Sequence, residues 1–186
     1  LGKSDLHDAA EFLLAAGAQR LPRKSVAKLE STSGDKRRLQ IAIINDDMPF
    51  LVDSIAATIT AHGLSIDCLL HPVIAASRNC EGELIALAAP GEDNDYKLAE
   101  SFIYIETPRL DARQRRELLS ALRATLKDVR AAVTDWPEAQ KAMQRDATTI
   151  GATSPESAAL LNWLNNGMLT QLGHVTRKRD GSISEA

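Results

Sequence analysis

The sequence predicts an α+β fold of the ferredoxin-like type: an antiparallel sheet with helices packed on one face, plus flanking helices. Two observations lead to this prediction. Four short apolar runs rich in β-branched residues are typical of strands, and two amphipathic stretches are typical of helices. Their order along the chain is strand, helix, strand, strand, strand, helix. Because this alternation is irregular, it favours an antiparallel sheet over a doubly wound parallel one.

The first strand is predicted at residues 39–44, and the next helix starts at an acidic and proline-containing pattern, residues 46–49. Apolar residues then recur every four positions at Leu51, Ile55 and Ile59. Gly63 ends the helix, because glycine tolerates the positive φ of a helix stop. In this interpretation Asp46 and Asp47 cap the helix and complement its dipole.

The remaining strands of the sheet are predicted at residues 64–76, 83–88 and 101–106. A turn at 77–82 joins the first two as a hairpin, and a polar loop at 90–95 precedes the third.

A long amphipathic helix follows the last strand. Asp111 stands at its expected N-cap, and a continuous apolar stripe follows at Leu118, Leu122, Leu126, Val129 and Val133. Pro137 is expected to end or kink this helix, because proline removes a backbone donor. Residues 138–149 then form a shorter helix.

The pattern divides the chain into three parts: an N-terminal helix and linker (1–35), the α+β domain (36–150), and a helix and strand that begin a next segment (151–186). The first part holds a helix at 5–20, and a polar loop at 30–38 leads into the domain. The third part holds a helix from Pro155 and a strand at 168–176.

Composition limits the class of function. The chain has 186 residues, 44% of them apolar, with a net charge of −3 and a pI near 5.8. This fraction is enough for a core, and the charge does not suggest a nucleic-acid partner. No apolar run approaches a membrane span, and no leader opens the chain, so we expect a cytoplasmic protein. Because the first residue is Leu1, we expect a piece of a longer polypeptide.

The sequence contains no recognisable catalytic motif. There is no G-x-G, no G-x-S-x-G and no C-x-x-C, so neither a dinucleotide-binding loop nor a nucleophile elbow is indicated. The four histidines are scattered, and we predict no metal site and no catalytic residue. His71, which precedes Pro72, is interpreted as a hydrogen-bonded sheet residue near an edge or bulge.

One segment is a candidate ligand site. Asn45, Asp46 and Asp47 precede the first predicted helix of the sheet domain, where free backbone N–H groups can bind an anion. The carboxylate of an amino acid would suit those groups, and the acidic pair would suit its ammonium group. Helix capping alone is the alternative explanation of the same residues.

The run at residues 45–54, followed by Gly63-Leu64 and His71-Pro72-Val73, resembles the N-terminal region of the large bacterial NAD-specific glutamate dehydrogenases. Further agreement in order and spacing is found at residues 100–106, 128–136, 162–164 and 172–173. The resemblance covers residues 39–174, most of the chain.

The resemblance implies an ACT-like domain of a large enzyme that oxidatively deaminates L-glutamate to 2-oxoglutarate and ammonia. NAD would then be the cofactor of the parent enzyme, with none in this chain. The implied partners are downstream catalytic domains, further copies in a homo-oligomer and an amino-acid effector. Phe50 stands where amino-acid-binding ACT domains carry a glycine, and its bulk would obstruct a ligand that approaches the backbone there. The candidate ligand-binding residues are thus Asn45, Asp46, Asp47 and Phe50. A stand-alone amino-acid sensor and a purely structural dimerisation domain are the alternatives.

Overall fold

The computed structural model describes residues 2–32, 37–88, 99–173, 175–178 and 180–185. The chain forms two compact units, Leu1–Lys127 and Asp128–Ala186. The predicted loop 90–95 and residues 33–36 of the loop 30–38 lie outside the described residues. The three-part division of the sequence stays a prediction.

An antiparallel sheet is the centre of the first unit. Within the described residues its strand order is β1-β2-β6-β4-β5, and β3 pairs with β6 beside β4. The strands are β1 (Val26–Ser31), β2 (Arg38–Asp46), β3 (Cys68–Leu70), β4 (Val73–Arg78), β5 (Leu84–Ala88) and β6 (Ala99–Pro108). The α+β class is therefore confirmed. The strand expected at 64–76 is split at His71-Pro72, and proline lacks the N–H that a ladder needs.

Strands β2 and β6 carry the core on both faces of the sheet. In their register Ile41 lies opposite Ile105, and Ala42 lies opposite Tyr104. Successive side chains of a strand point to opposite faces, so the odd-numbered isoleucines share one face and Ala42 shares the other with Ile44. All these side chains are buried. This continuous apolar run is typical of a strand covered on two sides.

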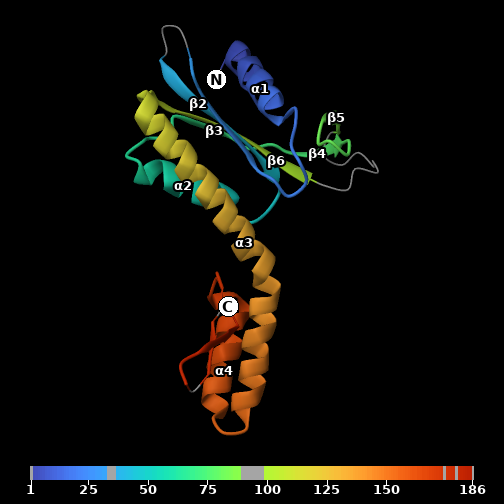
Figure 1. The fold of residues 1–186 in the computed structure, drawn as a ribbon, viewed down its shortest axis with the longest axis vertical. Helices are drawn as coiled ribbons and strands as arrows, with labels where there is room; N and C mark the ends of the chain where they lie inside the picture. The colour runs from blue at the N-terminus through green and yellow to red at the C-terminus, as the bar shows by residue number, and fades with distance from the viewer. Residues whose placement is uncertain (1, 33–36, 89–98, 174, 179, 186) are drawn as a thin grey trace. The chain divides into compact units, whose positions relative to one another are not determined.

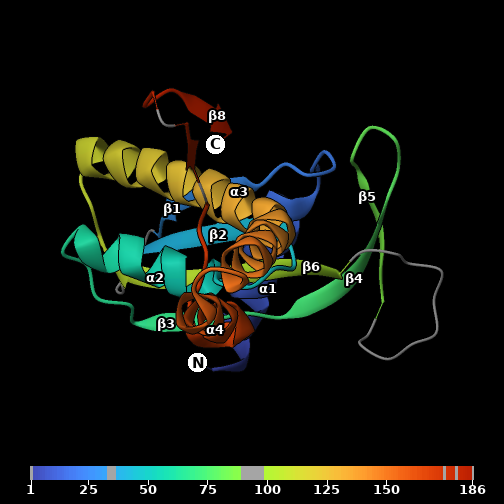
Figure 2. The same cartoon turned by 90° about the horizontal axis from the view of Figure 1, so that it is seen from below.

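Helices cover both faces. Helix α1 (Lys3–Gly17) packs Phe12 and Leu13 against the face that contains Ile44 and Phe102. Helix α2 (Leu51–Ala61) and the start of α3 (Ala112–Gly151) lie on the other side (Figures 1 and 2). The predicted flanking helix at 5–20 thus becomes part of the core. Strand β1 was missed, and its Glu30 and Ser31 were wrongly assigned to a loop.

The second unit is built from the rest of α3, α4 (Pro155–Trp163), a π-helical turn η1 (Leu164–Met168), and the short strands β7 (Thr176–Arg177) and β8 (Ile183–Glu185). The helix predicted from Pro155 is confirmed. Pro137 does not end α3, because one missing donor within a long helix leaves the other hydrogen bonds intact. The strand predicted at 168–176 was wrong, since Thr176 is the only described residue of that range that pairs in a ladder.

Candidate functional site

The end of β2 separates the predicted ligand residues instead of gathering them. Asn45 and Asp46 are the last two residues of the strand, so their side chains leave opposite faces of the sheet. Asn45 is buried, and its Nδ2 donates to the carbonyl oxygen of Asp46 at 2.9 Å. The carboxylate of Asp46 lies 2.8 Å from Nη2 of Arg20. Asp47 and Phe50 follow in the turn and are exposed.

The prediction that Asp46 and Asp47 cap the next helix was wrong. Helix α2 begins at Leu51 and its N-cap is Phe50, which adopts a left-handed conformation with φ 66°. The reason is that the β2–β6 ladder continues through the pair Asp46–Glu100, so the acidic residues end a strand several positions before the helix. Asp53 does lie in the first turn of α2, where a negative charge is favourable.

Asp47 is held by a short chain of hydrogen bonds. The hydroxyl of Ser101 donates to Oδ1 of Asp47 at 2.7 Å, so its oxygen accepts from Nε2 of His71 at 2.9 Å. The hydrogen-bonded role predicted for His71 is found. Ser101 is fully buried and gives its proton to a carboxylate, so this arrangement orients Asp47 and does not create a nucleophile.

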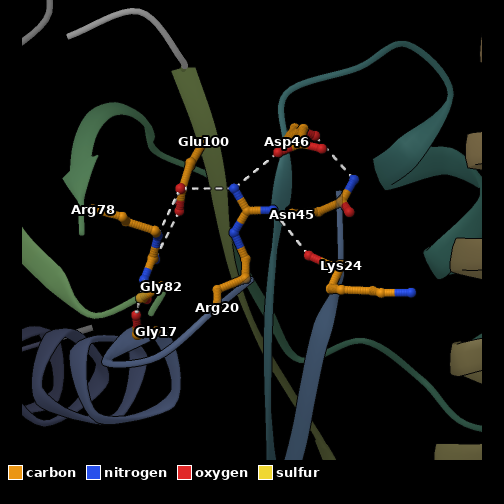
Figure 3. A network of polar contacts seen from close by, with 8 residues as sticks. All are labelled: Gly17, Arg20, Lys24, Asn45, Asp46, Arg78, Gly82 and Glu100. Carbon is orange, nitrogen blue, oxygen red and sulfur yellow. Dashed lines mark hydrogen bonds and ion pairs between the residues drawn. The ribbon is translucent and has the colours of Figure 1, made fainter. Parts of the chain in front are cut away.

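A buried ionic network lies beside the turn (Figure 3). Glu100 of β6 receives two parallel hydrogen bonds from Arg78 of β4, each 2.8 Å long. Nη2 of Arg20 lies 2.7 Å from Glu100 and 2.8 Å from Asp46. The side chains of Arg20 and Glu100 are each only 2% exposed, and charges so far from water are stable only when they are paired.

The two arginines also connect the network to the backbone. Nη1 of Arg78 donates to the carbonyl oxygens of Gly17 at 2.8 Å and Gly82 at 3.0 Å. Gly17 is the last residue of α1, so the cation also complements the negative end of that helix. Nη1 of Arg20 donates to the carbonyl oxygen of Lys24 at 2.9 Å. The network therefore joins α1, β2, β4 and β6 at one end of the sheet.

The turn at Gly82 requires glycine. Its φ is +84°, and a Cβ atom there would lie 2.6 Å from the carbonyl oxygen of Arg20. The backbone at Gly82 and Arg20 is paired directly, with an N–O distance of 2.8 Å. This close approach brings Arg20 under the β4–β5 hairpin, where its guanidinium reaches Glu100.

The charges of the network are strongly stabilised. Burial alone would raise the pKa of Glu100, but the hydrogen bonds from Arg78 and Arg20 outweigh it and hold that pKa below its ordinary value of 4.5. Burial also lowers the pKa of Arg20, and its bonds to Glu100 and Asp46 reverse the direction and raise it. Glu100 and Arg20 therefore remain ionised at neutral pH. Such a network can fix geometry, but its carboxylates are already committed to arginines.

Arg20, Arg78 and Glu100 were not predicted as site residues from the sequence. One signal was present: a glutamate at the start of an otherwise apolar strand has to find a cation when it is buried. The sequence does not show which arginines these are, because Arg20 and Arg78 lie 80 and 22 residues from Glu100 along the chain.

Among the described residues, no three His, Cys, Asp or Glu side chains are grouped closely enough to hold a metal ion. No helix in the described part of the chain is long and apolar enough to cross a membrane.

Comparison with known proteins places the fold in a family. The model of the glutamate dehydrogenase ACT1 domain matches residues 14–122, more than half of the chain. The chain belongs to this family. The matched ACT1 region contains the six-stranded sheet, all of α2 and the start of α3, together with the end of α1. The resemblance stated from sequence motifs is confirmed.

Two curated relatives agree with this placement. The NAD-specific glutamate dehydrogenase of Halomonas elongata is 30% identical over 144 residues, and that of Pseudomonas aeruginosa is 31% identical over 144 residues. Each match covers 72% of this chain and 9% of the relative. The ACT1 chain thus spans only a small part of the length of these enzymes.

Proposed function

We propose that this ACT1 chain is a non-catalytic assembly and regulatory domain of a NAD-specific glutamate dehydrogenase. The parent enzyme would oxidise L-glutamate to 2-oxoglutarate and ammonia, with NAD as the hydride acceptor. The observation that carries this proposal is the family match over the α+β unit. In addition, the matched region is only 9% of the length of each relative. We further propose a cytoplasmic homo-oligomer, in which the partners of the domain are the catalytic domains of the same chain.

The chemistry of the β2–α2 turn supports assigning NAD to other domains. A dinucleotide binds with its pyrophosphate at a glycine-rich strand-to-helix turn, where backbone N–H groups approach the phosphates. Here the turn between β2 and α2, residues 47–50, contains no glycine, and the charge of Asp47 would repel a phosphate, which has no ammonium group to pair with it. These residues do not fit the cofactor, and no step of the reaction is assigned to them.

The same turn is suited to an amino-acid effector. Ser101 holds only Oδ1 of Asp47, and the described residues supply no hydrogen bond or ion pair to its second oxygen. That oxygen is available for an ammonium group. The first N–H groups of α2 are available for a carboxylate. Asn45 and Asp46 would position the start of the turn through their bonds at the end of β2. The exposed Phe50 would cover one side of the site.

Calorimetry tests the regulatory part of the proposal. With glutamate, aspartate and the branched-chain amino acids, we expect saturable heat from at least one amino acid on the wild type and none on Asp47→Asn. The amide of Asn retains an acceptor for the Ser101 hydroxyl, so the free energy of unfolding should change by no more than about 1 kcal/mol. If no amino acid gives heat with the wild type, the regulatory role is contradicted and only the assembly role remains.

A further inference from the structure

The second unit exposes many large apolar side chains within a short stretch. Between residues 160 and 183, seven of them are 44–72% exposed: Leu160, Trp163, Met168, Leu169, Leu172, Val175 and Ile183. Single exposed apolar residues are ordinary on protein surfaces, whereas a concentration of them marks an interaction surface.

Three of these residues, Leu169, Leu172 and Val175, line a formed groove. Its cavity of about 430 Å³ lies between α3 and residues 169–173 and 175. Ala142 and Met143 of α3, Leu161 of α4, and Leu169, Leu172 and Val175 line it. Among the described residues that line it, Asp146 is the only charged one, and none of the described residues forms an ion pair with its carboxylate.

Gln171 holds the groove in shape. It is buried, and its Nε2 donates to Oδ1 of Asn165 at 3.0 Å and to Sδ of Met143 at 3.3 Å. These bonds fix the segment 169–173 against the helices, so Leu172 projects from a positioned backbone. A leucine that is held in this way and is 72% exposed beside the groove favours an interaction with a further element.

We propose that the groove is covered by an amphipathic segment of the same polypeptide, outside these 186 residues, with a lysine or arginine opposite Asp146. The charge of Asp146 favours a cationic residue in the covering segment. The match covers 9% of the length of the relatives, so a parent protein of their size has ample further chain to supply this segment. A segment tethered to the groove binds at an effective concentration near millimolar, so even a modest apolar contact is occupied. This inference rests on the proposed function, in which the chain is one domain of a longer enzyme.

The test is thiol labelling of Leu172→Cys in the 186-residue chain and in the full-length polypeptide, read from the mass of the labelled peptide. Leu172 is 72% exposed, and Lys141→Cys is the matched control, because Lys141 is 67% exposed on α3. We expect the rate at position 172 to fall at least tenfold in the full-length protein and the rate at 141 to change less than twofold. Adding Asp146→Lys to full-length Leu172→Cys should restore most of the lost rate.

Equal rates at position 172 in the two proteins would overturn the proposal, as would an equal fall at both positions. A rate at 172 that already falls with concentration in the 186-residue chain would show a second copy in the groove and would also overturn it. None of these three outcomes depends on amino-acid or NADH binding, so failure here is distinguishable from failure of the proposed function.

Discussion

Replacing Glu100 with glutamine should lower the free energy of unfolding by about 3–5 kcal/mol. Glutamine has the same shape, but its amide nitrogen would face an arginine N–H, and the charge that both Arg20 and Arg78 require would be lost. Asp46 alone would then remain for two buried cations. Urea denaturation of the wild type and Glu100→Gln measures the difference, with exposed Glu81→Gln as the control expected to change little.

The same pair of proteins should differ in pH dependence. Because the folded-state pKa of Glu100 lies below 4.5, its contribution is fully present above that pH and is lost as pH falls through the folded pKa. The difference between wild type and Glu100→Gln should therefore be largest near about pH 7 and should shrink below about pH 4. A difference under about 1 kcal/mol at neutral pH would mean that the network is open to water.

Truncating Leu122 to alanine should cost about 2–5 kcal/mol. Leu122 is fully buried on α3, between neighbours of the stripe that sequence periodicity predicted. The hydroxyls of Thr58 and Thr125, 2.7 Å apart, hold α3 to α2 next to this position, which limits collapse of the cavity. The midpoint of urea unfolding reports the loss.

Leu14→Ala on α1 is the matched control for Leu122→Ala. Leu14 is 43% exposed, so the same change removes less apolar area from the interior and should cost clearly less. Losses of similar size at the two positions would contradict the packing of α3 on the sheet.

The periodicity of apolar residues was enough to predict the centre of the fold. The runs 41–44 and 102–105 are continuous and apolar and predict β2 and β6, and the four-residue repeat from Leu51 predicts α2. Strand β1 was missed because Lys28 and Glu30 alternate with half-buried residues, and its pairing with β2 depends on the rest of the sheet.

The candidate site could be predicted only in part. The sequence located the turn after Asn45 but assigned Asp46 and Asp47 to capping, because acidic residues before a proline are typical of a helix start. Their true partners, Arg20 and Ser101, are distant in sequence, and only the completed sheet brings them close. Local pattern does not contain such pairings, so the ionic network required the three-dimensional structure.

A non-catalytic role requires that this ACT1 chain has no cofactor site of its own. Titration of NADH with the purified 186-residue chain, followed by nucleotide fluorescence, tests it most directly. We expect the fluorescence to stay unchanged, because the β2–α2 turn offers carboxylates where a pyrophosphate would bind. Saturable enhancement at micromolar NADH would contradict the account and would place cofactor binding within this domain.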